Sequence, residues 1–453
     1  MRFHGHKAIL ATAAFLLGSG TTLAQSPQAR HGDPVIRGID LERSTILDLQ
    51  KDMDHGRLSS LELTAFYLVR IAELNPDLHA VISTSPTALL EAALSDIRRA
   101  THQLRGPMDG IPTLLKDNVD TAILVGAAGS EALENATGRN AFLVRRLRAA
   151  GAVIIGKANL SEWANFRSFL SSSGWSALGG QTANPYVLDR NPCGSSSGSG
   201  SGISANLAVV AIGSETDGSI VCPSGANGIV GIKPTLGLVS RSGVVPISAE
   251  QDTAGPMTRN VTDAAVLLSV ITGVGDYTKF LDKHALRGKR IGVWCDVTGG
   301  DAATDAVFDK FISDLQRLGA TTVEVSLQLD VVFNNEFAAL LNEFKHDINA
   351  YLAATPGPHP ADLQGLIDFD VAHADTEMPF FQQEIFDLAQ TFSGDLTDPD
   401  YQAQRAAATG AAQHAIDDTL AQLHLDAIAA PTNSPAWVTT LGQGDNFVFG
   451  SST

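Results

Sequence analysis

With 453 residues, the chain is long enough to bury a large hydrophobic core, and its length alone allows two or three domains. Hydrophobic residues make up 44% and charged residues 18%, the ordinary balance of a soluble globular protein. The formal net charge of −18, without any cluster of lysine and arginine, argues against a nucleic-acid-binding protein, because such proteins need a basic surface for phosphates.

The start of the chain has the pattern of an export signal. A positively charged beginning is followed by an apolar stretch at residues 8–18 and a small-residue cleavage site that ends at Ala24. We therefore expect residues 1–24 to be a signal peptide and the protein to be secreted or periplasmic; an untargeted helix is the alternative. No segment reaches the roughly 20 apolar residues of a membrane helix, so we expect no association with a membrane.

Two amphipathic helices are expected next. Ser59 and Glu62 form a capping box before a segment, residues 63–74, whose apolar residues recur at helical spacing. Pro86 stands where a second such segment starts, and proline is favoured in the first turn of a helix.

An alternation of strands and helices then predicts an α/β fold. The expected strands are residues 110–115, 152–158, 206–213, 228–235, 289–295, 321–327 and 426–431. The expected helices are residues 141–151, 262–272, 303–319, 334–352 and 398–423, with turn residues at 254–260 and a surface connection at 273–288. The Ser/Gly tract 194–202 has the composition of a flexible linker, but it lies between strand-like segments, so we expect an ordered loop.

The three cysteines allow at most one disulfide. Cys193 and Cys222 lie on either side of the serine-rich segment, so a bridge between them is one interpretation. We expect instead that they are buried as small hydrophobic side chains, like Cys295. No CxxC or HExxH spacing indicates a metal site.

Residues 191–219 carry the chemistry of the chain. They form a Gly/Ser-rich loop, a short apolar run and an acidic Gly-Ser turn, and Lys116 follows the apolar run 111–115. Serine is a weak nucleophile until a base takes its proton. A lysine can be that base only when it is neutral, which requires removal from water. No histidine partner is at hand, so these residues indicate a serine nucleophile with a lysine base.

This combination resembles the amidase signature family, which hydrolyses amides with a Ser–Ser–Lys triad. The resemblance implies an α/β fold with a large mixed β-sheet flanked by helices on both faces, and it assigns Lys116 as the base. The block CGSSSGS implies that Ser195, after a cis peptide bond, bridges lysine and nucleophile. The turn ETDGSI implies that Ser219 forms the acyl-enzyme. The family needs no metal and no organic cofactor.

The same resemblance places the oxyanion hole at the backbone N–H groups of Thr216, Asp217 and Gly218. Many relatives have glycine where this chain has Asp217. Two interpretations of its carboxylate stay open: it faces a positively charged group of the substrate, or it caps the backbone that follows.

Further blocks, at residues 159–166, 173–186, 215–223 and 248–257, resemble bacterial peptide amidases. Those enzymes remove the C-terminal amide of peptides, release ammonia and leave internal peptide bonds intact. The resemblance therefore implies a small amide or an amidated peptide as substrate. It also implies that residues 169–173, including Ser171, line the acyl side of the pocket.

Two alternatives remain. The amidase component of glutamyl-tRNA amidotransferase shares the triad, although the expected export signal counts against it. The second is a non-catalytic remnant, because the sequence stops at residue 453 where the family continues with a small-residue helix and an apolar strand; we expect residues 25–453 to be an amidase domain shortened at its C-terminus. A Ser–His–Asp hydrolase would need a G-x-S-x-G elbow, which the turn at Ser219 lacks.

Overall fold

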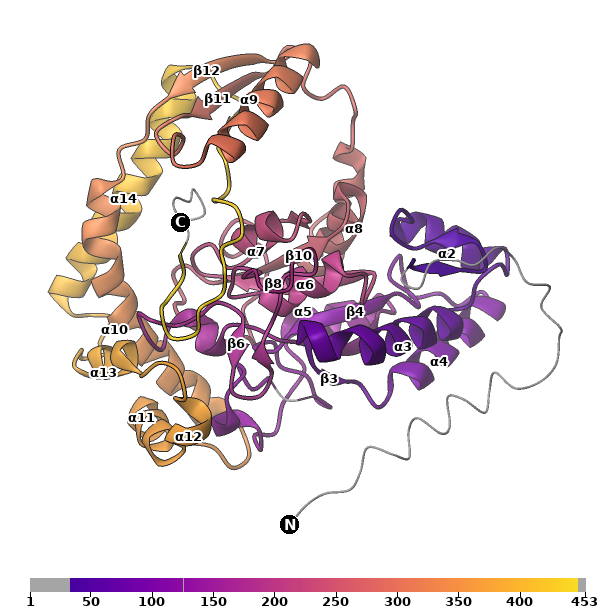
Figure 1. Ribbon diagram of the computed structural model, residues 1–453, viewed down its shortest axis with the longest axis horizontal. Helices are drawn as coiled ribbons and strands as arrows, with labels where there is room; N and C mark the ends of the chain where they lie inside the picture. The colour runs from indigo at the N-terminus through magenta and orange to yellow at the C-terminus, as the bar shows by residue number, and fades with distance from the viewer. Residues whose placement is uncertain (1–32, 125, 447–453) are drawn as a thin grey trace.

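The computed structural model describes residues 33–446 with the exception of residue 125 (Figure 1). The expected signal peptide, residues 1–24, lies outside this range, as do residues 447–453 at the end of the chain. Within the described range, no helix combines the length and the apolar character that crossing a membrane requires.

The main sheet is mixed and has six strands, in the order β3-β5-β4-β8-β10-β9. Their bounds are β3 Val81–Thr84, β4 Pro112–Lys116, β5 Val153–Ala158, β8 Val210–Glu215, β9 Val230–Gly231 and β10 Thr253–Thr258. The strand β4 runs parallel to both β5 and β8, whereas the other neighbours are antiparallel. The expected mixed sheet is confirmed.

The centre of this sheet brings two sequence blocks to one edge. Every residue of β4, β5 and β8 is buried, which explains their continuous apolar character, as is usual for parallel strands covered on both faces. Since β4 and β8 are parallel with Leu115 beside Ile212, both strands end on the same side. Lys116 at the end of β4 therefore lies near the turn that follows β8, and ligand sites commonly form at such carboxyl ends.

Helices pack against the sheet and against one another. The helices α3 and α4 contact β5, α6 contacts β4, β5 and β8, and α8 contacts β10. Their bounds are α2 Ile46–Asp54, α3 Ser60–Leu78, α4 Ala88–Ala100, α5 Phe142–Ala149, α6 Ser197–Ser204, α7 Val221–Ala226 and α8 Val261–Thr272. The capping box is confirmed: the Ser59 hydroxyl accepts from the Glu62 N–H at 3.1 Å, and the Glu62 carboxylate accepts from the Ser59 N–H at 2.9 Å.

Two local predictions were wrong. The Ser/Gly tract is not a loop but the buried helix α6, from Ser197 to Ser204. The residues expected to form a turn at 254–260 instead form most of the strand β10, although this segment contains Pro256. The strand β9 pairs only with Met257 and Thr258, so Pro256 lies beyond the end of that ladder and its missing N–H is tolerated there.

A second, smaller sheet has three parallel strands in the order β12-β11-β13. Figure 1 shows the long helices α10 and α14 running side by side between this sheet and the helices α11 to α13. The bounds are β11 Arg290–Trp294, α9 Ala302–Arg317, β12 Thr321–Val325, α10 Asp330–Ala354, α11 Leu363–Ala372, α12 Ala374–Glu377, α13 Glu384–Gln390, α14 Pro399–Gln422 and β13 Ala427–Ala429.

After β13 the chain returns to the main sheet, where the N–H of Asn191 donates to the carbonyl of Trp437 at 2.8 Å. Short elements complete the fold: strands β1 Val35–Ile36, β2 Ile39–Asp40, β6 Trp175–Ser176 and β7 Gly180–Gln181, and 3-10 helices Glu131–Leu133, Glu162–Asn165 and Tyr277–Phe280.

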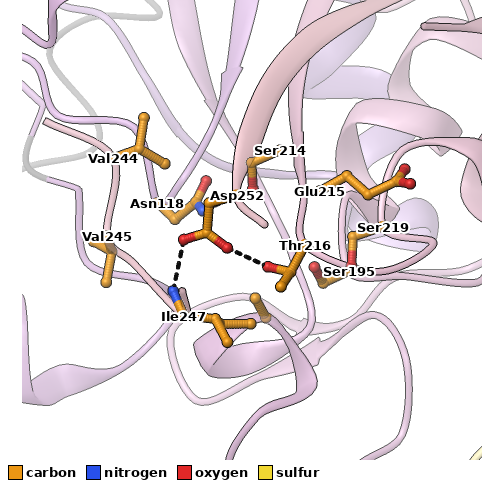
Figure 2. A pocket seen from close by; sticks show the side chains of 11 residues that line it. Asn118, Ser195, Ser214, Glu215, Thr216, Ser219, Val244, Val245, Ile247 and Asp252 are labelled. Carbon is orange, nitrogen blue, oxygen red and sulfur yellow. Dashed lines mark hydrogen bonds between the residues drawn. The ribbon is translucent and has the colours of Figure 1, made fainter. Parts of the chain in front are cut away.

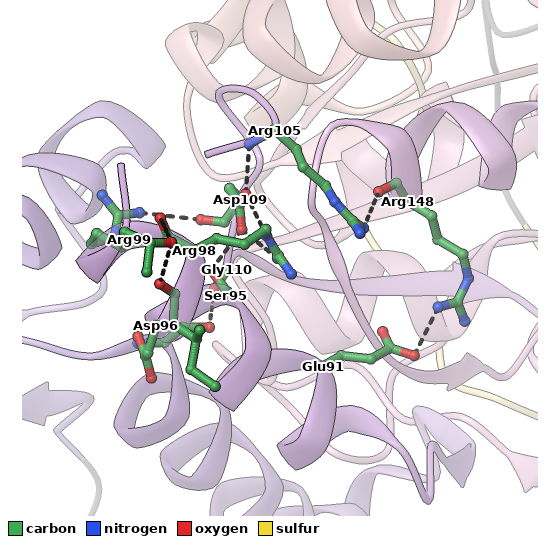
Figure 3. A network of polar contacts seen from close by, with 12 residues as sticks. Glu91, Ser95, Asp96, Arg98, Arg99, Arg105, Asp109, Gly110 and Arg148 are labelled. Carbon is green, nitrogen blue, oxygen red and sulfur yellow. Dashed lines mark hydrogen bonds and ion pairs between the residues drawn. The ribbon is translucent and has the colours of Figure 1, made fainter. Parts of the chain in front are cut away.

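A buried ionic network fixes the segment that leads into β4 (Figure 3). Asp109 is fully buried and accepts hydrogen bonds from the Ser95 hydroxyl at 2.6 Å and from Arg98 Nε at 3.0 Å and Nη2 at 2.6 Å. The backbone N–H of Arg105 also donates to Asp109, at 2.7 Å. Since Ser95 and Arg98 belong to α4, the network ties this helix to the start of the strand that carries Lys116.

Candidate active site

Lys116 is fully buried at the end of β4 and all its hydrogen-bond partners are neutral oxygens. Its Nζ donates to the Ser195 hydroxyl at 2.7 Å, to the Ser214 hydroxyl at 2.9 Å and to the Ser214 carbonyl at 3.1 Å. The structure thus brings the predicted base into direct contact with the predicted bridging serine.

The environment of this lysine favours its neutral form. Burial lowers the pKa of Lys116 from 10.5 to about 7, and the negative charges of Asp252 and Glu215 only partly oppose that shift. A base whose pKa lies near the working pH is the most effective at proton transfer. A large fraction of Lys116 is therefore neutral and able to accept a proton near neutral pH.

Ser195 and Ser219 line the same small cavity beside Lys116 (Figure 2). The Gly194–Ser195 peptide bond is cis, as the resemblance implied. The N–H of Ser196 donates to the carbonyl of Ser219 at 3.1 Å, which holds the two backbone segments together. Among the described residues we find no hydrogen bond between the two serine hydroxyls, so the relay has its first contact in place and its second contact only in proximity. Catalytic hydrogen bonds are often completed only when substrate binds.

The turn around Ser219 is held by a carboxylate that the sequence analysis did not identify. Glu215, the last residue of β8, is buried and accepts from the N–H groups of Ile220 at 2.6 Å and Val221 at 3.0 Å. Gly218 has a φ of 73°, a conformation that residues with a side chain rarely adopt. Together these contacts present Ser219 at the start of α7.

Thr216 is fixed by a second carboxylate that was also missed. Its hydroxyl donates to Asp252 at 2.5 Å, and Asp252 in turn accepts from the N–H groups of Ile247 at 2.8 Å and Ser248 at 3.1 Å. Burial raises the pKa of Asp252 to about 6. The block at residues 248–257 contained this signal, but a single sequence does not show which carboxylate reaches which hydroxyl.

The backbone N–H groups of Thr216, Asp217 and Gly218 donate no hydrogen bond within the described part of the chain. Buried backbone donors are nearly always paired, so neighbouring free donors beside a serine hydroxyl are unusual. They are suited to donate hydrogen bonds to an oxyanion.

A second buried lysine shapes the turn after Lys116. Lys157 on β5 is fully buried, donates to the carbonyls of Asp117 at 3.2 Å and of Val119, and lies 3.8 Å from the Asp117 carboxylate. Asn118 in the same turn donates to the Ser214 hydroxyl at 2.8 Å. This lysine has charged and polar partners throughout, and its part is to hold the turn.

A cavity of about 240 Å³ opens in front of Ser219. Its lining comprises Ala164, Asn165, Phe166, Ser173, Cys193, Gly194, Thr216, Asp217, Gly218, Ser219, Cys222, Ile247, Phe337, Leu340, Asn433 and Asp445. The wall thus has an apolar side, to which the long helix α10 contributes, and a polar side formed by the nucleophile turn. Within the described residues, no group of three or more histidine, cysteine, aspartate and glutamate side chains could hold a metal ion.

The expectation of unpaired buried cysteines was wrong for two of them. Cys193 and Cys222 form a disulfide, with their Cα atoms 5.9 Å apart, and Cys295 is free. The bridge joins the loop before Ser195 to the helix after Ser219. The sequence left both interpretations open because only the packing of α7 beside this loop brings the two sulfur atoms together.

Ser171 lies behind the cavity wall, not in it. Its hydroxyl donates to the Asn165 side chain at 3.0 Å, and Asn165 lines the cavity and donates to the Ser173 hydroxyl at 3.0 Å. Ser173 is itself a lining residue whose N–H donates to Asp445 at 2.9 Å. The part of residues 169–173 that faces the cavity is therefore Ser173.

Comparison with known proteins agrees on one class of enzyme, the amidases. Residues 62–446 match the amidase family. A probable amidase of Arabidopsis thaliana is 40% identical over 383 residues, which cover 79% of this chain and 73% of the relative. The chain therefore belongs to the amidase signature family, and it is an amide-hydrolysing enzyme by class.

Within the family, similarity to peptide amidase is high. The crystal structure of a peptide amidase in complex with the competitive inhibitor chymostatin superimposes with a TM-score of 0.88 at 46% identity, covering 90% of this chain and 88% of the other. The amidase component of the glutamyl-tRNA(Gln) amidotransferase of Acinetobacter baumannii is 34% identical over 348 residues, 72% of this chain and 70% of the relative. The expected family and the expected mixed-sheet fold are both confirmed.

Proposed function

We propose that this amidase hydrolyses the C-terminal amide of short peptides through an acyl-enzyme on Ser219, with Lys116 as the base and Ser195 as the bridge. The observation that carries the proposal is the fully buried Lys116, whose Nζ lies 2.7 Å from the Ser195 hydroxyl beside the turn of Ser219. Similarity to a peptide amidase that binds a peptide-like inhibitor supports an amidated peptide as the substrate.

In the first half of the reaction, the Ser219 hydroxyl attacks the amide carbonyl. Its proton passes to the Ser195 oxygen as the Ser195 proton passes to neutral Lys116. The carbonyl oxygen becomes an oxyanion, which the free N–H groups at Thr216 to Gly218 stabilise. The carbon–nitrogen bond then breaks, and the nitrogen takes the proton back along the same path and leaves as ammonia.

In the second half, water replaces ammonia. A water molecule attacks the ester on Ser219, again giving its proton through Ser195 to Lys116. The carbon–oxygen bond to Ser219 breaks, and the serine oxygen regains a proton. The products are a peptide with a free carboxyl group and the starting enzyme. No metal or organic cofactor takes part in this sequence of steps.

The amidase component of a glutamyl-tRNA amidotransferase is the second candidate, favoured by the similarity to the Acinetobacter protein. Such a protein would hydrolyse the side-chain amide of glutamine. The two candidates therefore differ in the position of the amide that they attack. We also propose that the protein is exported, on the pattern of residues 1–24; cell fractionation and N-terminal sequencing of the mature protein would test this, and an intact N-terminus in the cytoplasm would contradict it.

The function is tested by measuring ammonia released from amidated dipeptides, from the same dipeptides with a free carboxyl group, and from glutamine. The proposal predicts ammonia only from the amidated dipeptides, with intact internal bonds by chromatography, and none from a folded Ser219→Ala variant. Release from glutamine alone would favour the amidotransferase component. No release from any amide by a folded enzyme would contradict the proposal and favour the non-catalytic alternative.

A further inference from the structure

The cavity in front of Ser219 contains one carboxylate that the protein does not use for its own structure. Asp217 lines this cavity, its side chain is exposed, and it makes no hydrogen bond or ion pair among the described residues. The other carboxylates nearby are engaged: Glu215 and Asp252 accept backbone N–H groups, and Asp445 accepts the N–H of Ser173. The capping interpretation of Asp217 is therefore wrong, because Glu215 caps the backbone that follows.

The charges around Asp217 are unfavourable to it. Glu336 on α10 and Glu215 at the end of β8 both repel its negative charge, and only the exposed Lys233 attracts it. Asp445 adds a further carboxyl group to the cavity lining, which contains no lysine, arginine or histidine among the residues described. An open carboxylate in such surroundings lacks a positive partner that a ligand can supply.

The protonation of Asp217 follows from these surroundings. The protein walls that keep water from the carboxyl group, and next the charge of Glu336, raise the pKa of Asp217 to about 7. Although the side chain reaches solvent, it is thus only partly ionised near neutral pH. A bound cation would hold it in the ionised form, so that binding of a cation becomes stronger as the pH rises through about 7.

We propose that Asp217 selects substrates that carry an ammonium group close to the scissile amide, while the apolar wall of Phe166, Phe337 and Leu340 receives their hydrocarbon part. This inference rests on the proposed function and narrows its substrate class. Asp217 is a specificity-determining residue, and it takes no part in the proton relay.

The position of Asp217 limits where the ammonium group can be. It lies two residues before Ser219, and one residue of extended chain spans roughly 3.3–3.6 Å. The ammonium group therefore lies about one or two residues from the carbonyl that Ser219 attacks. Two groups satisfy this: the free N-terminus of a dipeptide amide, and the side chain of a C-terminal lysine amide.

The test compares matched substrates with and without the positive charge. One pair is glycyl-phenylalanine amide and its N-acetyl derivative, measured at about pH 7.5; the other is N-acetyl-lysine amide and N-acetyl-norleucine amide, measured from about pH 6 to 8.5. We expect kcat/KM to favour the charged member of at least one pair by about three- to tenfold, and the pair that shows it identifies the source of the ammonium group. In the lysine pair, the preference rises with pH through about 7.

Two variants make the test specific. Asp217→Asn removes the negative charge, so the preference falls to about onefold and no longer depends on pH. Glu336→Gln removes the repelling charge but keeps Asp217, so the preference persists and its rise moves to lower pH. A preference that survives in Asp217→Asn, or equal hydrolysis of both members of both pairs by the wild type, overturns the inference and leaves the amidase function intact. Failure to hydrolyse any of the four amides overturns the proposed function and the inference with it.

Discussion

Two buried lysines lie on neighbouring strands, and their partners separate their roles. Lys157 lies against the carboxylate of Asp117 and two backbone carbonyls, which stabilise a positive charge. Lys116 has only serine oxygens and one carbonyl, with no carboxylate in hydrogen-bond contact. Removal of a charge from water is expensive unless it is paired, so Lys116 is the lysine that gives up its proton readily.

The first prediction concerns the pH dependence of the reaction. Lys116 must be neutral to accept the proton of Ser195, and its pKa of about 7 makes the neutral form dominant above that pH. We therefore expect kcat/KM for a neutral, acetylated peptide amide to rise with pH to a plateau, with a midpoint near 7. A midpoint near the pKa of an ordinary lysine, about 10.4, or a flat profile would contradict this role.

At the scale of single residues, the sequence alone indicated the three residues that the structure brings to one site, because each stands in a distinctive block. Ser195 and Ser219 lie in Gly/Ser-rich segments, and Lys116 ends an apolar run. Glu215 and Asp252 were not found as supporting residues, since their function depends on which backbone N–H groups the fold places near them.

At the scale of elements, the strands and helices with strong periodicity were predicted well, and the Ser/Gly tract was not. The helix α6 contains three glycines and four serines, residues of low helix propensity, so its sequence gives no helical signal. Close packing explains the glycines: a Cβ at Gly198 would lie 2.3 Å from the carbonyl oxygen of Ala80. Tertiary packing therefore imposes a helix where the sequence alone favours a loop.

The second prediction concerns the network of Asp109 beneath β4 (Figure 3). Burial opposes its ionisation, but hydrogen bonds from Arg98, Ser95 and the N–H of Arg105 outweigh that effect and lower the pKa of Asp109. Asp109→Asn removes the negative charge and leaves Arg98 without its partner, so we expect the free energy of unfolding to fall by about 3 kcal/mol near neutral pH.

Chemical denaturation would measure this loss. The matched control is Asp54→Asn, which removes an ion pair between Arg99 and a carboxylate that is 57% exposed. That pair contributes at most about 1 kcal/mol, as exposed pairs usually do. Equal effects of the two substitutions would show that the Asp109 network does not hold α4 to β4.

At the scale of the whole molecule, the described chain has two sheets, of which the larger carries the catalytic candidates and the smaller is reached through α10 and α14. The strands of both sheets were predicted individually, but their division into two sheets was not. Strand pairing is a long-range property, and short apolar runs do not indicate which strand lies beside which.

The third prediction is that the whole molecule is more stable in mild acid. Burial raises the pKa values of several carboxyl groups well above the ordinary value of 3.8: Asp117, Asp120 and Asp252 to about 6, and Asp370 to about 7. Such groups stabilise the fold while they are protonated, and that contribution is lost as the pH rises through their folded-state pKa values. The lowered pKa of Lys116 acts in the opposite direction only above about pH 7.

We therefore expect a higher unfolding temperature at about pH 5.5 than at about pH 7.5, measured by calorimetry at equal ionic strength. The net charge of −18 acts in the same sense, since protonation reduces self-repulsion. A higher unfolding temperature at about pH 7.5 would contradict the assignment of these carboxyl groups as buried and protonated.

The most direct test of the central claim, an acyl-enzyme on Ser219, is partitioning between water and added hydroxylamine. A peptide amide and the methyl ester of the same peptide would pass through one intermediate, from which either nucleophile releases the acyl group. We predict that both substrates give the same ratio of hydroxamate to free acid, and that a folded Ser219→Ala variant gives neither product. A ratio that differs between the amide and the ester, or product formation without Ser219, would contradict the account.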